Sequence, residues 1–260
     1  MPVFRSIVFS AALAGLIVGA VISVAQFFGT VPLIQKSEIY ERKAAAEASP
    51  AGNDEAGAPH DHGKTHGHDS EWQPEDGFQR NAFTVAANIL TAIGFALLLT
   101  GAYAIRGRPV TWREGLLWGL GGFVVFTAAP GLGLPPELPG MPVAELTARQ
   151  IWWIATAAAT ATGLCLLAFR SAAWAAFLGL GLIALPHLIG APLAPELHSE
   201  VPAALSHRFI LVVTLTNLLF WALLGVSTSI AFGRISADGS KLNIIQVPSV
   251  PPLSAAKNIK

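Results

Sequence analysis

A repeated polar segment between long apolar runs constrains the fold of this chain more than any other feature. Residues 134–151 read LPPELPGMPVAELTARQI, and residues 193–210 read LAPELHSEVPAALSHRFI. When the two segments are aligned without a gap, eight residues are identical. Among them, Pro136, Glu137 and Arg149 correspond to Pro195, Glu196 and Arg208. Each copy lies between two apolar runs, a pattern typical of duplicated membrane hairpins.

The apolar runs predict an all-α polytopic membrane protein with about six transmembrane helices, arranged as two or three repeated helical hairpins. Hydrophobic residues make up 53% of the 260 residues and charged residues only 12%, whereas soluble domains average about 25% charged residues. A span of about 30 Å of hydrocarbon needs about 20 helical residues. The fifth run is short and contains a proline. The six runs are Ile7–Phe28, Ala82–Ile105, Gly115–Gly133, Ile151–Phe169, Trp174–Ile189 and Phe209–Phe232.

These runs divide the chain into four parts. Residues 1–28 form a first transmembrane helix, which we expect to be retained because signal-peptide cores are shorter. Residues 29–81 form a His- and acid-rich loop whose composition predicts disorder, with helical character over Lys36–Ala48. Residues 82–232 form the helical bundle, with an internal repeat of residues 115–169 and 174–232, and residues 233–260 form a loose polar tail.

Basic residues sort to one side of the predicted membrane. Short links rich in Lys and Arg face the cytoplasm, which places both termini inside and the His-rich loop in the periplasm of a bacterial inner membrane. The short outer links carry only Arg149 and Arg208. The formal net charge is zero, so nothing indicates nucleic acid binding. The basic residues on the inner side are Arg5, Arg106, Arg108, Arg113, Arg170, Arg234, Lys241, Lys257 and Lys260.

We hypothesise that the repeat has three copies. An outer arginine precedes each even-numbered span, at Arg80, Arg149 and Arg208. Repeats in the same orientation are related by an axis along the membrane normal. This arrangement would place Glu137 and Glu196, with Glu38 as a further candidate, around a common outer mouth.

A histidine cluster, HDHGKTHGH, is the strongest sign of metal chemistry. Imidazole and carboxylate groups suit Zn, Ni, Co and Cu, and a flexible loop can gather several of them around one ion. The alternative is a solvated linker that is His-rich by chance; we favour metal capture. The GKT at residues 63–65 lacks the first glycine of a P-loop, so nothing indicates an ATPase. The candidate ligands are His60, His62, His66 and His68.

Four further residues are candidate metal ligands within or beside the membrane. His187 follows Pro186 near the outer end of the fifth run, and ionisable groups at membrane depth are usually functional; it could equally bond to a neighbouring helix. His198 lies in the second link. Glu137 and Glu196 either bind a cation at the mouth or form ion pairs with Arg149 and Arg208 that close each hairpin. Asn88 and Asn217 are expected to join helices.

The N-terminal span, the His-bearing outer loop, LPPELPG followed by RQIWW, and PHLIGAP resemble the CbtA family of predicted cobalt transporter subunits. The resemblance covers nearly the whole chain. It implies an inner-membrane protein for cobalt uptake, a small single-span partner subunit with its own His-rich tail, and a link to cobalamin supply. The family is often described with five spans.

Three functional hypotheses follow. The first is a permease, or permease subunit, for uptake of a divalent transition metal, with Co²⁺ first and Ni²⁺ or Zn²⁺ as alternatives. The second is a membrane-anchored metal-binding chaperone or sensor without transport. The third, ranked last, is a redox subunit with a bound cofactor, since only His187 lies deep enough to ligate one. None is an enzyme. The expected partners are the lipid bilayer, the single-span subunit and a second copy of the chain.

Overall fold

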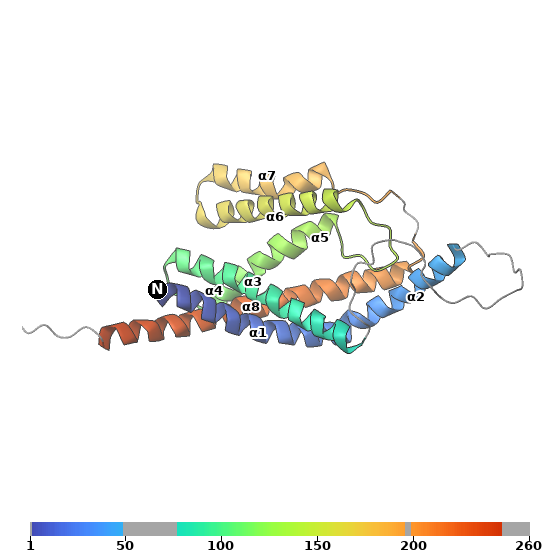
Figure 1. The fold of residues 1–260 in the computed structure, drawn as a ribbon. Helices are drawn as coiled ribbons and strands as arrows, with labels where there is room; N and C mark the ends of the chain where they lie inside the picture. Colours follow the sequence, from blue (N-terminus) through green and yellow to red (C-terminus); the bar gives the residue numbers. More distant parts are fainter. Residues whose placement is uncertain (1, 49–76, 196–198, 246–260) are drawn as a thin grey trace, which may run out of the picture.

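In the computed structural model, which describes residues 2–48, 77–195 and 199–245, the chain is a bundle of long helices without strands over those residues (Figure 1). Five helical segments are long and apolar enough to cross a membrane, so the chain is a multi-pass membrane protein. The helices are α1 (Pro2–Gly29), α2 (Val31–Ala48), α3 (Phe78–Arg106), α4 (Trp112–Phe123), the π-helical turn η1 (Val124–Ala128), α5 (Ala129–Gly133), α6 (Leu146–Phe169), α7 (Ala173–Ile189) and α8 (Ala203–Ile245).

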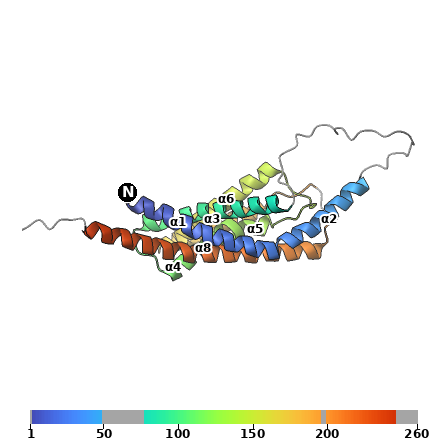
Figure 2. The same cartoon turned by 60° about the horizontal axis from the view of Figure 1, so that its bottom comes forward.

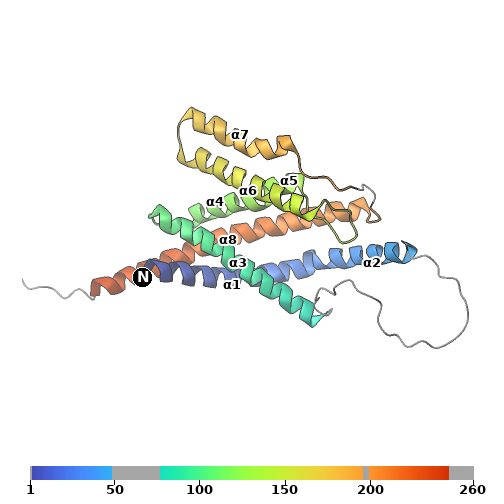
Figure 3. The same cartoon turned by 45° about the horizontal axis from the view of Figure 1, so that its top comes forward.

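The two ends of the bundle differ in composition. We call one the basic end; α1 begins there, α3 and α6 end there, and its arginines include Arg5, Arg106, Arg113 and Arg170. We call the opposite one the loop end; it holds α2, the link at residues 134–145 and the described parts of the second link, residues 190–195 and 199–202 (Figures 1 and 3).

Each of the six predicted apolar runs lies in a helical segment, but only five meet the length of a membrane span. The exception is α7, the fifth run, whose 17 residues are short for a crossing. It contains Pro186, which cannot donate a backbone hydrogen bond, and it ends at Gly190 with φ +91°.

Two regions predicted to lack regular structure are more helical than expected. Within the loop predicted at residues 29–81, residues 31–48 form α2. This helix begins before Lys36, where helical character was expected. An ion pair between Glu38 and Arg42, one turn apart, stabilises α2. Helix α3 then begins at Phe78 rather than Ala82. Helix α8 runs through the predicted tail to Ile245, because no proline interrupts the chain before Pro248.

The core forms where α1, α3, α4 and α8 cross. Val18, Tyr103, Trp221 and Leu224 are each almost fully buried there. Hydroxyl groups within the spans bond to carbonyls of their own helix, as Thr100 does to Ala96 and Thr228 to Leu224. Such bonds satisfy polar groups where no water is available.

Glycines allow the closest helix crossings. Gly15 and Gly19 of α1 face Ile93 and Ile89 of α3, and a Cβ on Gly19 would lie 2.6 Å from the Ile89 Cα. Gly115 and Gly119 of α4 meet Gly225 of α8 with the two backbones almost touching. Gly163 of α6 faces Gly179 of α7 in the same way. Small residues at these points bring helices close enough for dispersion contacts to hold them together.

The α6–α7 hairpin lies to one side of this core (Figures 1 and 3). It contacts the remainder of the bundle mainly through η1 and α5. A proline explains the π turn, because Pro130 lies inside the otherwise continuous helical segment and its ring would clash with the carbonyl of Phe126 in an α-helix. The wider turn instead joins the Ala129 N–H to the Val124 carbonyl, five residues back.

We predict that Gly119→Ala destabilises the protein. The added methyl would overlap the backbone of α8 at Trp221, and overpacking of this kind costs about 1–3 kcal/mol. The control is Gly94→Ala in α3, where a Cβ meets nothing within 4 Å and alanine is favoured over glycine in a helix. Thermal unfolding in detergent should show a lower midpoint for Gly119→Ala alone. Equal midpoints would mean that the α4–α8 crossing does not limit stability.

Candidate functional site

Of the eight candidate ligands, Glu137 and His187 lie in the described part of the chain. The two residues are not brought together: Glu137 lines a cavity at the loop end, and His187 does not. No group of three or more His, Cys, Asp or Glu side chains suited to a metal forms among the described residues. The candidates outside the described residues are His60, His62, His66, His68, Glu196 and His198.

The Glu137 cavity lies among η1, α5, α6 and α8 and has a volume of about 960 Å³. Its walls include the aromatic side chains of Phe126 and Trp153. It extends from the first link, at the loop end, toward the middle of α8. Its lining is mostly apolar, and it includes five oxygen-bearing side chains, those of Thr127, Glu137, Gln150, Thr214 and Asn217.

An ion pair occupies the mouth of this cavity. The Arg149 Nη2 donates to the Glu137 Oε2 at 2.7 Å, and the two side chains are 29% and 20% exposed. The pair corresponds to one of the two alternatives predicted for Glu137. The Arg149 Nε is buried without a hydrogen-bond partner within the described part of the chain. The guanidinium of Arg149 is therefore only partly satisfied by hydrogen bonds within the described residues.

Arg149 is held in place by the start of α6. Glu145 is the N-cap residue, and its carboxylate accepts hydrogen bonds from the backbone N–H groups of Thr147 and Ala148 at 2.8 and 2.7 Å. These bonds lower the pKa of Glu145. The Arg149 N–H in turn bonds to the Glu145 carbonyl at 3.1 Å. The cap thus fixes the backbone from which Arg149 reaches Glu137.

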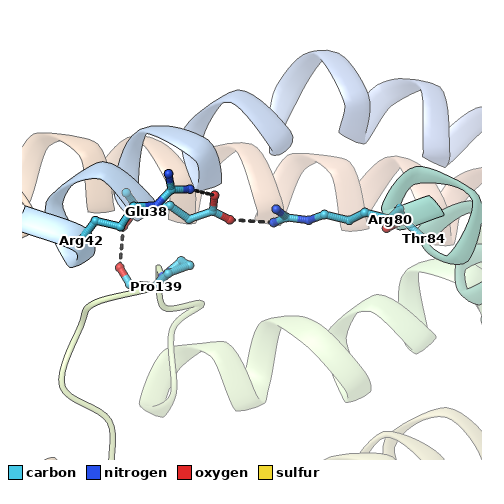
Figure 4. Close-up of polar contacts among 6 residues, drawn as sticks. Glu38, Arg42, Arg80, Thr84 and Pro139 are labelled. Atoms are coloured by element: carbon cyan, nitrogen blue, oxygen red, sulfur yellow. Dashed lines mark hydrogen bonds and ion pairs between the residues drawn. The ribbon is translucent and has the colours of Figure 1, made fainter. Parts of the chain in front are cut away.

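A second glutamate–arginine pair joins α2 to α3. The Glu38 carboxylate lies between two guanidinium groups, 2.7 Å from Arg80 and 3.6 Å from Arg42 (Figure 4). The hydroxyl of Ser37, beside it, donates to the carbonyl of Pro139 in the first link at 2.6 Å. Glu38 therefore pairs across α2 and α3, whereas Glu137 pairs within its own hairpin.

Helix α2 is packed against the link that carries Glu137. Leu33 of α2, Leu138 of the first link, and Val201 and Phe209 of the second link and α8 form a small apolar cluster. Gly140 adopts a positive φ of +80°, and a Cβ there would lie 3.1 Å from the Glu41 Cβ. Helix α2 extends beyond this contact, away from the bundle (Figures 1 and 2). The chain leading to the His-rich segment is thus anchored beside the cavity mouth.

His187 packs against Trp152 rather than in the cavity. The two rings lie edge to face with centroids 6.0 Å apart, and the Trp152 Nε1 is buried without a partner among the described residues. Trp152 also fills the space beside Gly133. Its neighbour Trp153 faces the Glu137 cavity instead. His187 thus contacts a neighbouring helix through its ring, and its predicted role as a metal ligand stays a prediction.

The two asparagines within the spans differ in surroundings. The Asn88 amide of α3 donates to Ser23 at 3.1 Å and to Gln26 at 2.8 Å, so it joins α3 to α1 as expected. The Asn217 amide donates to the Val213 carbonyl of its own helix at 3.0 Å and also lines the Glu137 cavity.

Sequence reasoning did not identify Thr127, Gln150 and Thr214 as cavity residues. Gln150 directly follows Arg149, and Thr214 lies three residues before Asn217 on α8. A helical-face analysis around Asn217 could have found Thr214, whereas adjacent residues such as Arg149 and Gln150 point to different sides of a helix. Thr127 could be found only by predicting the π turn, which depends on how Pro130 is accommodated.

Comparison with known proteins gives one match. The family model described as "Probable cobalt transporter subunit (CbtA)" matches residues 4–233. No curated protein matches the chain, and no solved structure does.

We predict that Glu145→Ala lowers thermal stability at neutral pH, because two N–H groups at the start of α6 lose their acceptor. The pKa of the Glu145 carboxyl is lowered in the folded state, so its contribution is present above the ordinary value of 4.5 and is lost as the pH falls through the lowered value. Unfolding midpoints of both proteins at about pH 7 and about pH 3 should therefore converge in acid. Glu200→Ala, which removes an exposed carboxylate from the second link, is the control. A difference that persists in acid would contradict the capping role.

Proposed function

The chain belongs to the CbtA family of probable cobalt transporter subunits, and from that membership we propose that it is the permease subunit through which Co²⁺ enters the cell. The observation that carries the proposal is the Glu137–Arg149 pair at the mouth of a cavity lined with oxygen donors. A cavity between membrane helices that carries several polar side chains serves a permease, whereas a chaperone or sensor that only binds metal needs no such path.

We propose that the cation enters by displacing Arg149 from Glu137. A dication at the same distance attracts a carboxylate twice as strongly as a guanidinium does, because the Coulomb energy is proportional to charge. Arg149 has a buried Nε without a partner among the described residues, so it can move without losing a full set of hydrogen bonds. In the absence of a cation, the pair neutralises the mouth and keeps an unpaired carboxylate from being buried.

Beyond the mouth, Thr127, Thr214 and Asn217 offer oxygen atoms in place of hydration waters. Oxygen donors suit Mg²⁺, Ca²⁺ and Mn²⁺ as well as Co²⁺, so this cavity does not by itself select a transition metal. We assign that selection to imidazole groups before the mouth, at His60, His62, His66, His68 and His198. Helix α2, packed on the first link, supports this assignment because it anchors one end of the His-rich segment beside the mouth.

The proposed orientation places the loop end outside and the basic end, with both termini, in the cytoplasm of a bacterial inner membrane. The arginines at the basic end support it through the positive-inside rule. An inward-negative potential then favours entry by roughly 2.3 kcal/mol per charge per 100 mV. A dication can therefore be accumulated without ATP.

The word subunit in the family description implies a partner. We propose a small single-span protein with its own His-rich tail, with self-association as the alternative. Ni²⁺ and Zn²⁺ are the alternative substrates, and metal binding without transport is the alternative function.

We predict opposite effects for the two members of the ion pair. Glu137→Gln should lower uptake of radioactive cobalt about tenfold or more, because a charged ligand is lost, and Glu196→Gln should do the same if the second copy has the same role. Arg149→Gln should instead lower the cobalt concentration that gives half-maximal uptake, because Glu137 no longer has a competing cation. Uptake is measured in cells with matched amounts of protein in the membrane, with Glu200→Gln as control. If Glu137→Gln and Arg149→Gln lose cobalt uptake equally, the ion pair has a structural role only.

We predict that deleting residues 59–69 weakens uptake chiefly at low cobalt, because the histidines concentrate the ion before it reaches the mouth. The maximal rate at saturating cobalt should be unchanged. Deletion of residues 49–58, a segment of similar length without histidine, is the control. A reduced maximal rate in the 59–69 deletion alone would show that the histidines act in translocation itself.

A further inference from the structure

A second cavity lies near the basic end, between α3, α4 and α6, with a volume of about 540 Å³. Its lining is apolar apart from Arg106 and Glu114 at one end. Leu98, Leu117 and Phe169 line it and are 61%, 67% and 60% exposed, so it opens to the surface of the bundle. All three residues belong to predicted membrane spans. The cavity therefore opens toward the hydrocarbon of the bilayer.

Contacts between the helices do not close this cavity. Helix α6 packs on α7, η1 and α5, and it makes little contact with α3 or α4. Gly121 faces the cavity from α4, where a Cβ would meet nothing within 4 Å. An empty apolar volume of this size forfeits dispersion contacts on every wall, so a ligand that fills it would stabilise the α6–α7 hairpin against the core.

Arg106 and Glu114 form the polar end of the cavity. The Arg106 Nη2 donates to the Glu114 Oε1 at 3.0 Å, and the other carboxylate oxygen of Glu114 accepts from the Thr111 N–H at 2.9 Å. A guanidinium has five N–H donors, and the Arg106 side chain is 23% exposed, so donors remain for a second anion. Arg170 directly follows Phe169 of the lining, and Arg113 directly precedes Glu114 and lies 5.4 Å from the ring of Trp112. Arg106 is thus the basic residue of the lining, and Arg113 and Arg170 are neighbours of lining residues in the sequence.

We propose that this cavity is a binding site for an anionic phospholipid, with one acyl chain between α3, α4 and α6 and the phosphate at Arg106. Basic pockets between membrane helices bind anionic headgroups, and guanidinium groups match phosphate oxygens. The volume falls within the roughly 300–1,000 Å³ of small-molecule sites. A spanning helix about 10 Å wide and 30 Å long occupies on the order of 2,000 Å³. The site therefore suits a lipid chain rather than a partner helix.

The lipid would connect the two parts of the bundle. Its chain would touch α6 on one side and α3 and α4 on the other, near the aromatic side chains of Phe126 and Trp118. Its headgroup would lie at the end of α3, beside the start of α4. This role does not depend on the proposed function, since it concerns the opposite end of the bundle from the Glu137 cavity.

The test measures which lipids stay with the full chain purified in mild detergent from a bacterial membrane. We expect phosphatidylglycerol or cardiolipin to be retained over phosphatidylethanolamine, and added phosphatidylglycerol to raise the unfolding midpoint. Gly121→Leu should fill the cavity with a side chain and displace the lipid. Arg106→Gln and Arg170→Gln should each reduce retention of the anionic lipid about tenfold.

Arg234→Gln, which removes a basic residue from α8 outside the cavity lining, is the matched control and should retain the lipid as the unaltered chain does. If Arg106→Gln fails to fold, Arg170→Gln and Gly121→Leu still test the proposal. Retention that is equal for anionic and zwitterionic lipids, or unchanged in Gly121→Leu, would overturn it. Loss of a co-purified small polypeptide from Gly121→Leu, with lipid unaffected, would assign the cavity to a partner helix and overturn it as well.

Discussion

Close contact between glycine-bearing helix faces is the constraint on which the rest of this structure depends. In a bilayer, apolar side chains gain little by leaving lipid for protein, so helices must associate through dispersion and hydrogen bonds at short range. The crossings of α1 with α3, α4 with α8, and α6 with α7 each contain a glycine whose missing side chain permits that approach. Tyr103 of α3 adds a contact with Thr228 of α8 at 3.3 Å inside the core.

These crossings also explain why cavities form where they do. The α6–α7 hairpin uses its glycines to hold its own two helices together, so it meets the core only at η1 and α5. One cavity opens on each side of that junction; the one at the loop end carries several polar side chains, whereas the one near the basic end is apolar apart from Arg106 and Glu114. Phe126 of the π turn lines both cavities and stacks on Trp221 of α8, with ring centroids 5.6 Å apart. Phe126 is thus part of the wall between the two cavities.

The sequence was sufficient to predict the all-helical membrane class, the position of each apolar helix and the pairing of Glu137 with Arg149. Each of these depends on local pattern: hydropathy over a span, or a charge pair repeated at constant spacing. The extent of α2 and α8 was underestimated, because helices in polar segments gain their stability from packing, as Leu33 does against Leu138. Thr127 and Gln150 were missed as cavity residues because cavity lining depends on the π turn and on how α6 is placed.

The glutamate–arginine pairs at the loop end share one electrostatic requirement. A partly buried carboxylate needs a positive partner, and Arg80 and Arg149 each lie near the start of a long helix that holds them at the loop end. Glu38 has two guanidinium partners and also supports α2 through its neighbour Ser37, whereas Glu137 has one, on a link that faces a cavity. The carboxylate with two partners is thus the one that joins two helices, and the carboxylate with a single partner lies where the link meets the cavity, so the proposed exchange of partners falls to Glu137.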